Sequence, residues 1–247
     1  MLTLNSNDPV AIALVEAIHA GDLQSLRRLL AAPPGLAAAR IEGNKGSSRT
    51  PLHVATDWPG YFPNGPAVVT MLLAAGADPN APLMGARHAE TPLHWAASSD
   101  DVDVAEALIA GGANLEAPGA SIGGGTPLDD AVGYGCWQVA RLLVERGARV
   151  ERLWHAAALG LTSRLEAFFA EPVQPAPNEV NDAFWQACHG GKRRAAAYLL
   201  TRGADLNWIP DYAKNTPLDM AGSVDTAREA LVNWLRDQGA RSAGGLT

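Results

Sequence analysis

The sequence has few cysteines, few lysines and no long apolar run, and each shortage excludes a class of protein. Two cysteines, Cys136 and Cys188, are too few for a disulfide scaffold and have no further ligands at zinc-site spacing. We therefore expect no metal and no cofactor. No run of about 18 apolar residues exists, so no membrane-spanning helix is predicted. The N-terminal segment lacks the charged start and cleavage site of a signal peptide. These absences predict a cytoplasmic protein with reduced thiols.

Positive charge is scarce and scattered. The formal net charge is −7, only 3 of the 19 basic residues are lysines, and the densest basic cluster is 192–194. A nucleic-acid binder needs a basic face, because phosphate contacts supply most of its affinity. We expect neither nucleic acid nor a membrane as a partner. Abundant arginine and alanine, with little lysine, suggest a GC-rich bacterial genome.

One phrase recurs along the chain. Thr-Pro-Leu followed by His or Asp begins at residues 50, 91, 126 and 216, with a small alanine two positions further on. The last gap is long enough for three repeats. Two degenerate copies, 151–157 and 182–188, fill it and keep the apolar and small positions. With an N-terminal copy, repeats are predicted to start near residues 12, 50, 91, 126, 151, 182 and 216.

The residue types in the phrase predict a pair of helices in each repeat. Threonine is a good N-cap, and proline at the first helical position loses no needed donor. Five of the seven predicted repeats close on an apolar pair followed by Gly-Ala, as in 72–77 and 199–204, and glycine there ends a helix. One such pair cannot bury its own apolar face, so repeats must stack.

The phrase resembles the ankyrin signature Thr-Pro-Leu-His-x-Ala. The chain is similar to bacterial-type ankyrin-repeat proteins, with about seven repeats, two of them degenerate. The resemblance implies an all-α solenoid of helix-turn-helix units with short loop or β-hairpin fingers between repeats. It also implies one domain over 1–247, in which we expect the tail 241–247 to be disordered.

Two segments depart from the repeat pattern. Residues 57–66 insert Trp58, Tyr61 and Phe62 among prolines and glycines, which predicts an ordered loop. Its aromatic rings either cover the edge of the stack or contact a partner. Residues 171–178 contain three prolines and predict an extended connector.

The resemblance also implies which side chains face the concave groove between helices and fingers. They follow the fourth position of the phrase, on one helical face. The resulting candidates for partner binding are Trp95, Asp130, Tyr134, His155, Gln186 and His189, together with Trp208, Asp211 and Tyr212 of one finger and Trp58 of the inserted loop.

Two interpretations of these residues remain open. Trp and Tyr are typical anchors of protein interfaces, which favours a non-enzymatic module that binds an unidentified protein. Alternatively, Asp130, His155, His189 and Tyr134 could form a small-molecule or acid–base pocket, because histidine titrates near neutral pH. Each residue alone is also compatible with an ordinary solvated helix face. We predict the protein-binding module, acting as a monomer, and assign no catalytic residue.

Overall fold

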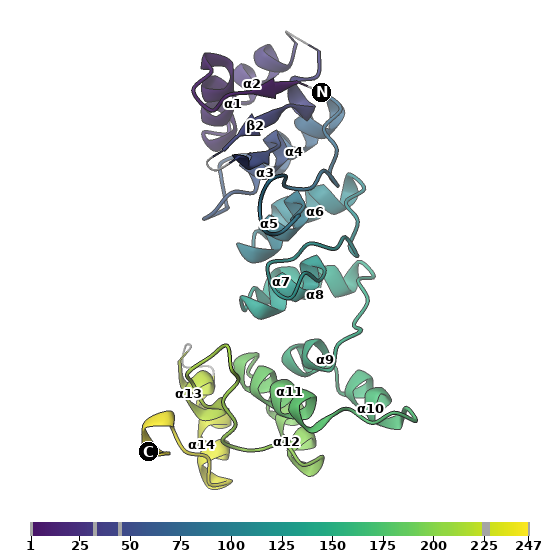
Figure 1. Ribbon diagram of the computed structural model, residues 1–247, viewed down its shortest axis with the longest axis vertical. Helices are drawn as coiled ribbons and strands as arrows, with labels where there is room; N and C mark the ends of the chain where they lie inside the picture. Colours follow the sequence, from purple (N-terminus) through teal and green to yellow (C-terminus); the bar gives the residue numbers. More distant parts are fainter. Residues whose placement is uncertain (1, 32–33, 44–45, 224–227, 247) are drawn as a thin grey trace. The chain divides into compact units, whose positions relative to one another are not determined.

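The computed structural model describes residues 2–31, 34–43, 46–223 and 228–246 (Figure 1). Fourteen α-helices in the described residues form seven successive pairs, and the two helices of each pair pack on one another. This confirms the predicted all-α repeat architecture. The chain forms two compact units, Met1–Ala148 and Arg149–Thr247, with four helix pairs in the first and three in the second. The single domain over 1–247 stays a prediction from the sequence.

The first unit contains the well-preserved repeats. Its helices are α1 (Pro9–His19), α2 (Leu23–Leu30), α3 (Pro51–Ala55), α4 (Gly65–Ala74), α5 (Pro92–Ser98), α6 (Val102–Ala110), α7 (Pro127–Gly133) and α8 (Trp137–Glu145), with a short 3-10 helix, η1 (Leu36–Ala38). Three short strands, β1 (Thr3–Leu4), β2 (Arg40–Glu42) and β3 (Ser48–Arg49), form a sheet in that order. The antiparallel pair β2–β3 is a hairpin finger. The later fingers consist of turns, bends and irregular segments, and Met84 in one of them forms an isolated antiparallel bridge with Ser48.

The second unit contains the two degenerate repeats and the last one. Its helices are α9 (Leu153–Leu159), α10 (Thr162–Ala170), α11 (Pro177–His189), α12 (Arg193–Thr201), α13 (Pro217–Gly222) and α14 (Glu229–Asp237), with η4 (Ala243–Gly245) in the tail. Helix α11 starts five residues before the predicted repeat start at 182. Pro177 occupies its first turn, and the Glu179 carboxylate accepts the N–H of Ala176 at 2.8 Å, so the connector supplies its own cap.

The repeated threonine begins helices as the sequence predicted. Thr50, Thr91, Thr126 and Thr216 are the N-cap residues of α3, α5, α7 and α13, each followed by proline. Thr50, Thr91 and Thr216 are buried, and Thr126 is half-buried. A capping threonine is worth about 1 kcal/mol, so these positions fix where each repeat starts.

Leucine and alanine fill the core of both units. In the second unit Phe184, Leu165, Leu199 and Leu235 are fully buried against small residues such as Ala183. Burying one leucine contributes roughly 1.5–3 kcal/mol. The small residues let neighbouring helices approach closely, so the stack is held by these leucines.

The described part of the C-terminal tail, 241–246, is hydrogen-bonded to the last repeats. The Arg241 N–H donates to Asn207 Oδ1 at 2.7 Å, and the Ala243 N–H donates to Asp219 Oδ2 at 2.8 Å. This differs from the expected disorder of residues 241–247, because two side chains accept the tail's backbone donors. Thr247 lies outside the described residues.

Candidate partner-binding site

Asp130 is buried inside the first unit and holds a finger loop. It is 0% exposed, and its Oδ1 accepts from Ser121 Oγ at 2.8 Å and from the Ile122 N–H at 3.0 Å. Ser121 Oγ also lies 2.8 Å from the Tyr134 hydroxyl, whose side chain is 53% exposed. Burial raises the pKa of the Asp130 carboxyl. Of this pair, only Tyr134 offers a surface to a partner.

Trp95 lies in another part of the first unit, half-buried between repeats. Its ring meets His53 edge-on, with centroids 5.1 Å apart, and its side chain is hydrogen-bonded to Glu90. Burial, and then the charge of Asp130, raise the pKa of Glu90 to about 7. Trp95 also lines a hollow of about 760 Å³ together with apolar side chains such as Ile12.

The inserted loop after α3 is anchored on both sides and leaves one ring free. Phe62 stacks on His19 with ring centroids 4.3 Å apart, and the Tyr61 N–H donates to Asp101 Oδ2 at 2.6 Å. Trp58 is 81% exposed. Phe62 packs on the stack, Tyr61 is hydrogen-bonded to it but is 58% exposed, and Trp58 projects into solvent; a partner contact by the loop stays a prediction.

In the second unit, the predicted groove residues form a chain of contacts. His155 is buried beside the ring of Trp154, 4.1 Å away, and Gln186 is also buried. His189 Nδ1 lies 3.3 Å from Gln186 Oε1, and Gln186 Nε2 donates to the Tyr212 hydroxyl at 3.4 Å. Tyr212 is the one member of this chain with a largely exposed side chain, at 66%.

The chain continues to an acidic residue that the sequence analysis did not single out. The Tyr212 hydroxyl donates to Asp182 Oδ1, and burial raises the pKa of that carboxyl. Burial also raises the pKa of Tyr212 itself, with the Asp182 charge as the second cause. Burial, and then Arg228, lower the pKa of His189 to about 4. At neutral pH the His189 imidazole and the Tyr212 phenol are therefore neutral.

A cavity of about 810 Å³ lies beside this chain, entirely within the second unit. It is bounded by the start of α9, the ring of Phe168 on α10, the proline connector, the first half of α11 and one finger. The lining residues are Glu151, Arg152, Leu153, Trp154, Phe168, Glu171, Val173, Gln174, Pro175, Asn178, Glu179, Asp182, Trp208, Asp211 and Tyr212. Its volume falls in the roughly 300–1,000 Å³ range of ligand-binding sites.

Aromatic rings and carboxylates dominate the cavity wall. Four lining residues are aromatic and five are acidic, against the single basic residue Arg152. Trp185 packs edge-on against Tyr212 from behind, with ring centroids 5.8 Å apart. Gln174 Nε2 donates to the Glu171 carbonyl at 2.6 Å and so folds the connector that forms one rim. The cavity thus has a supported aromatic wall and an excess of negative charge.

Three predicted site residues line this cavity, and several others do not. Trp208, Asp211 and Tyr212 belong to its wall, whereas Gln186 and His189 support it from inside. Trp95, Asp130, Tyr134 and Trp58 belong to the first unit. The four candidates for acid–base chemistry are therefore divided, with Asp130 and Tyr134 in one unit and His155 and His189 in the other.

The sequence carried a signal for the residues that were missed. At the first position of the phrase, where four repeats place threonine, the degenerate copies have Glu151 and Asp182. Both line the cavity. A carboxylate at a position where threonine usually caps the helix is a departure from the repeat pattern. The predicted groove residues were counted only from the position after the fourth, so this first position was not considered.

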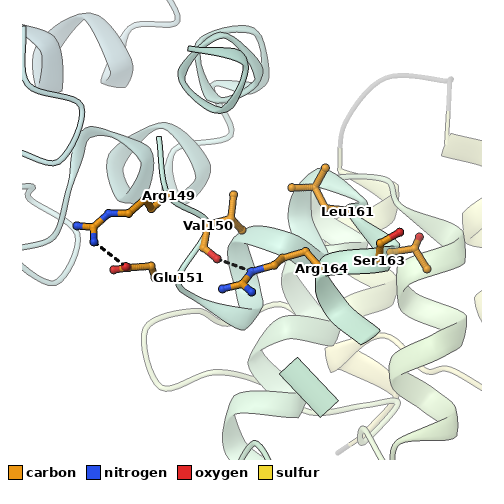
Figure 2. A pocket seen from close by; sticks show the side chains of 7 residues that line it. Arg149, Val150, Glu151, Leu161, Ser163 and Arg164 are labelled. Atoms are coloured by element: carbon orange, nitrogen blue, oxygen red, sulfur yellow. Dashed lines mark hydrogen bonds and ion pairs between the residues drawn. The ribbon is translucent and has the colours of Figure 1, made fainter. Parts of the chain in front are cut away.

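A second hollow in the same unit, of about 560 Å³, offers less chemistry (Figure 2). Figure 2 shows its charged side chains turned toward nearby protein groups. Arg149 pairs with Glu151 at 3.0 Å, and Arg164 Nε donates to the Val150 carbonyl at 2.9 Å. These contacts tie α10 to the segment before α9.

The comparisons with known proteins agree with the repeat pattern. Residues 64–152 match the family described as ankyrin repeats (3 copies). The chain is also 29% identical, over 209 residues, to an ankyrin repeat and KH domain-containing protein of Caenorhabditis briggsae. That alignment covers 81% of this chain, which spans only 7% of the relative's length.

Residues 64–152 of the chain are thus identified as ankyrin repeats. Ankyrin repeats are generally protein–protein interaction modules. The matched residues run from α4 to the segment before α9, and the structure shows helix pairs on both sides of them. Bacterial origin stays a prediction from composition. No helix in the described ranges is long and apolar enough to cross a membrane.

In two of the ankyrin phrases, the histidine at the fourth position links neighbouring repeats. His53 Nε2 lies 3.0 Å from the Glu90 carbonyl, and His94 Nε2 lies 3.5 Å from the Gly125 carbonyl. In both cases the acceptor immediately precedes the threonine of the next repeat. Trp185 holds the same position and donates its Nε1–H at 2.9 Å to the carbonyl of Asn215, which precedes Thr216. The degenerate repeat therefore keeps the link with a different ring.

Proposed function

We propose that this protein binds a protein partner in the aromatic cavity of its second unit, with the finger 208–212 as one wall. The observation that carries the proposal is the cavity itself, in which Trp154, Trp208 and Tyr212 gather around about 810 Å³. Tryptophan and tyrosine dominate the binding energy of protein interfaces. Protein binding is also the general role of ankyrin repeats.

The predicted groove residues support this site more than they compose it. Gln186 and His189 are linked to Tyr212 by hydrogen bonds, and Trp185 backs the same ring. A side chain held by packing and hydrogen bonds loses little entropy on binding, which favours affinity. The partner would therefore bind in this one cavity and not along the whole concave groove, and the finger 208–212 would form one wall of the site.

Catalysis by the four candidate residues is not part of the proposal. Asp130 is fully buried, and its Oδ1 accepts hydrogen bonds from Ser121 and Ile122. His189 has a pKa of about 4 because of its burial, far below the near-neutral value that suits a general base. Both side chains serve the repeat structure.

The expected setting completes the proposal. We propose a monomer in the cytoplasm that binds neither nucleic acid nor a membrane. Cys136 and Cys188 are buried, and burial raises the pKa of Cys136 to about 11, which keeps that thiol protonated and unreactive. A net charge of −7 and an acidic cavity oppose phosphate backbones.

The test is selection of peptides from a displayed library against the full chain, followed by measurement of their affinity. We expect Trp208→Ala to lower the affinity for the selected peptides by about tenfold or more, as for an interface anchor. Trp58→Ala is the matched control, because it removes another tryptophan from the surface of the first unit.

Three outcomes decide the proposal. Loss of binding in Trp208→Ala but not in Trp58→Ala supports it. The reverse pattern rejects the cavity as the site and moves recognition to the inserted loop. Failure of any peptide to bind better than it binds an unrelated protein of similar charge rejects protein recognition.

A further inference from the structure

Resting on the proposed function, we propose that the partner presents a basic segment and that the cavity of the second unit takes an arginine side chain from it. The inference concerns the chemistry of the partner, which neither the repeat family nor the relative specifies. It follows from the charge of the cavity wall, the position of one carboxylate and the arrangement of the rings.

The charge of the wall is strongly one-sided. Five lining carboxylates face one guanidinium, that of Arg152. Glu179 also caps α11 and Glu151 pairs with Arg149, which leaves Glu171, Asp182 and Asp211 as the acids best placed to meet a partner. Such a surface attracts cations and repels acidic segments.

Asp182 is the carboxylate from which a bound cation gains most. It is half-buried at the cavity wall and accepts from the Tyr212 hydroxyl. Its burial raises the pKa, so the ionised form has lost solvation that the single tyrosine donor only partly replaces. A guanidinium offers several N–H donors in a planar fork that matches a carboxylate.

The rings of the wall suit the flat faces of a guanidinium. Trp154, Trp208 and Tyr212 line the cavity beside the acids. Phe168, the fourth lining ring, already carries the guanidinium of Arg164 at 4.5 Å from its centroid. Stacking of arginine on aromatic faces contributes about 0.5–2 kcal/mol, depending on desolvation. The second unit thus already contains one arginine–aromatic contact, and the rings of the cavity wall could make the same kind of contact with an arginine of the partner.

The spacing of the acids favours an extended partner over a single metal ion. Within the described ranges, no three Asp, Glu, His or Cys side chains are grouped as metal ligands would be. The carboxylates instead come from the segment before α9, the connector, α11 and the finger. Charges spread around a space of this size match a basic side chain together with the polypeptide that carries it.

The experiment titrates the full chain with three blocked peptides of one design. The first is acetyl-Gly-Arg-Gly-Arg-Gly-amide, and the others replace arginine by lysine or by citrulline, which has the shape of arginine without its charge. We expect the arginine peptide to bind about tenfold more tightly than the citrulline peptide and more tightly than the lysine peptide. The NMR signals of the indole N–H groups of Trp154 and Trp208 should shift with arginine and not with citrulline.

Variants place the effect in the cavity. Asp182→Asn keeps an acceptor for the Tyr212 hydroxyl and removes the charge, and combined with Asp211→Asn it should weaken the arginine peptide by about tenfold. Glu166→Gln is the matched control, because Glu166 is an exposed acid on α10 outside the cavity. We expect that variant to change the affinity by less than about twofold.

The outcomes separate this inference from the proposed function. Equal affinity for the citrulline or the lysine peptide overturns arginine recognition, as does an equal loss in Glu166→Gln. The indole shifts decide the matter in the wild type even where a variant fails to fold. Selected peptides that require Trp208 but contain no basic residue would overturn this inference and leave the proposed function standing.

Discussion

The two units use different side chains to link one repeat to the next: histidine in the first unit and tryptophan in the second. This difference accompanies the cavity in the second unit. In the first unit, His53 and His94 link each repeat to the next. Their Nδ1 atoms accept the N–H of Thr50 and Thr91, at 3.3 and 3.0 Å, so Nε2 carries the proton that is donated onward. A histidine at the fourth position thus needs a free backbone N–H at the first.

The second unit cannot meet that requirement at α11. This helix begins at Pro177, so the N–H of Asp182 lies in its interior and is used by the helix ladder. Trp185 has a donor and no acceptor, and it makes the onward bond to Asn215 without needing a partner on its other side. Its larger ring also reaches Tyr212. The exchange of histidine for tryptophan therefore goes together with an aromatic wall.

The largest expected effect is a difference in acid stability between the units. Burial lowers the pKa of both His53 and His94 to about 4, below the unfolded value of about 6.5. The folded state then binds fewer protons, so each histidine stabilises it fully above pH ~6.5, and this contribution is lost as pH falls towards 4. We expect a loss of about 3 kcal/mol for each histidine over that window.

Hydrogen exchange resolved along the chain, measured between pH 7 and 4, would check this. The double variant His53→Gln/His94→Gln should be less stable at pH 7 and much less sensitive to acid in the first unit. His189→Gln is the control, because the pKa of His189 is also lowered to about 4 but the residue lies in the second unit. An unchanged pH slope in the double variant would show that other groups cause the acid sensitivity.

The next effect tests the tryptophan link. Trp185→Ala removes a buried ring and the bond to Asn215, and we expect the second unit to lose roughly 3–5 kcal/mol of unfolding free energy. Urea unfolding would give the loss, and exchange protection would locate it. Trp185→His sharpens the comparison: it should recover little, because the interior N–H of Asp182 is not free to meet Nδ1. Full recovery by histidine would contradict the account given for α11.

The contrast also shows what the sequence could and could not predict. Threonine, proline and glycine act locally, so the helix starts at Thr50, Thr91, Thr126 and Thr216 could be predicted from spacing alone. The start of α11 could not, because it depends on a cap between Ala176 and Glu179 outside the repeated phrase. The resemblance placed Asp130 and His155 on an accessible face, yet both are buried. Burial depends on how neighbouring loops fold over a helix, as Ser121 and Ile122 do over Asp130.

The smallest effect concerns Asp130, the buried carboxylate of the first unit. Asp130→Ala leaves the donors of Ser121 and Ile122 without their acceptor, and we expect a cost of about 1–3 kcal/mol. Tyr134→Phe, which removes only one exposed hydroxyl from the same network, should cost less than about 1 kcal/mol. Thermal unfolding of both variants would measure the difference. A neutral or stabilising Asp130→Ala would indicate that this residue is kept for a function, and the comparison would then assign sites to both units.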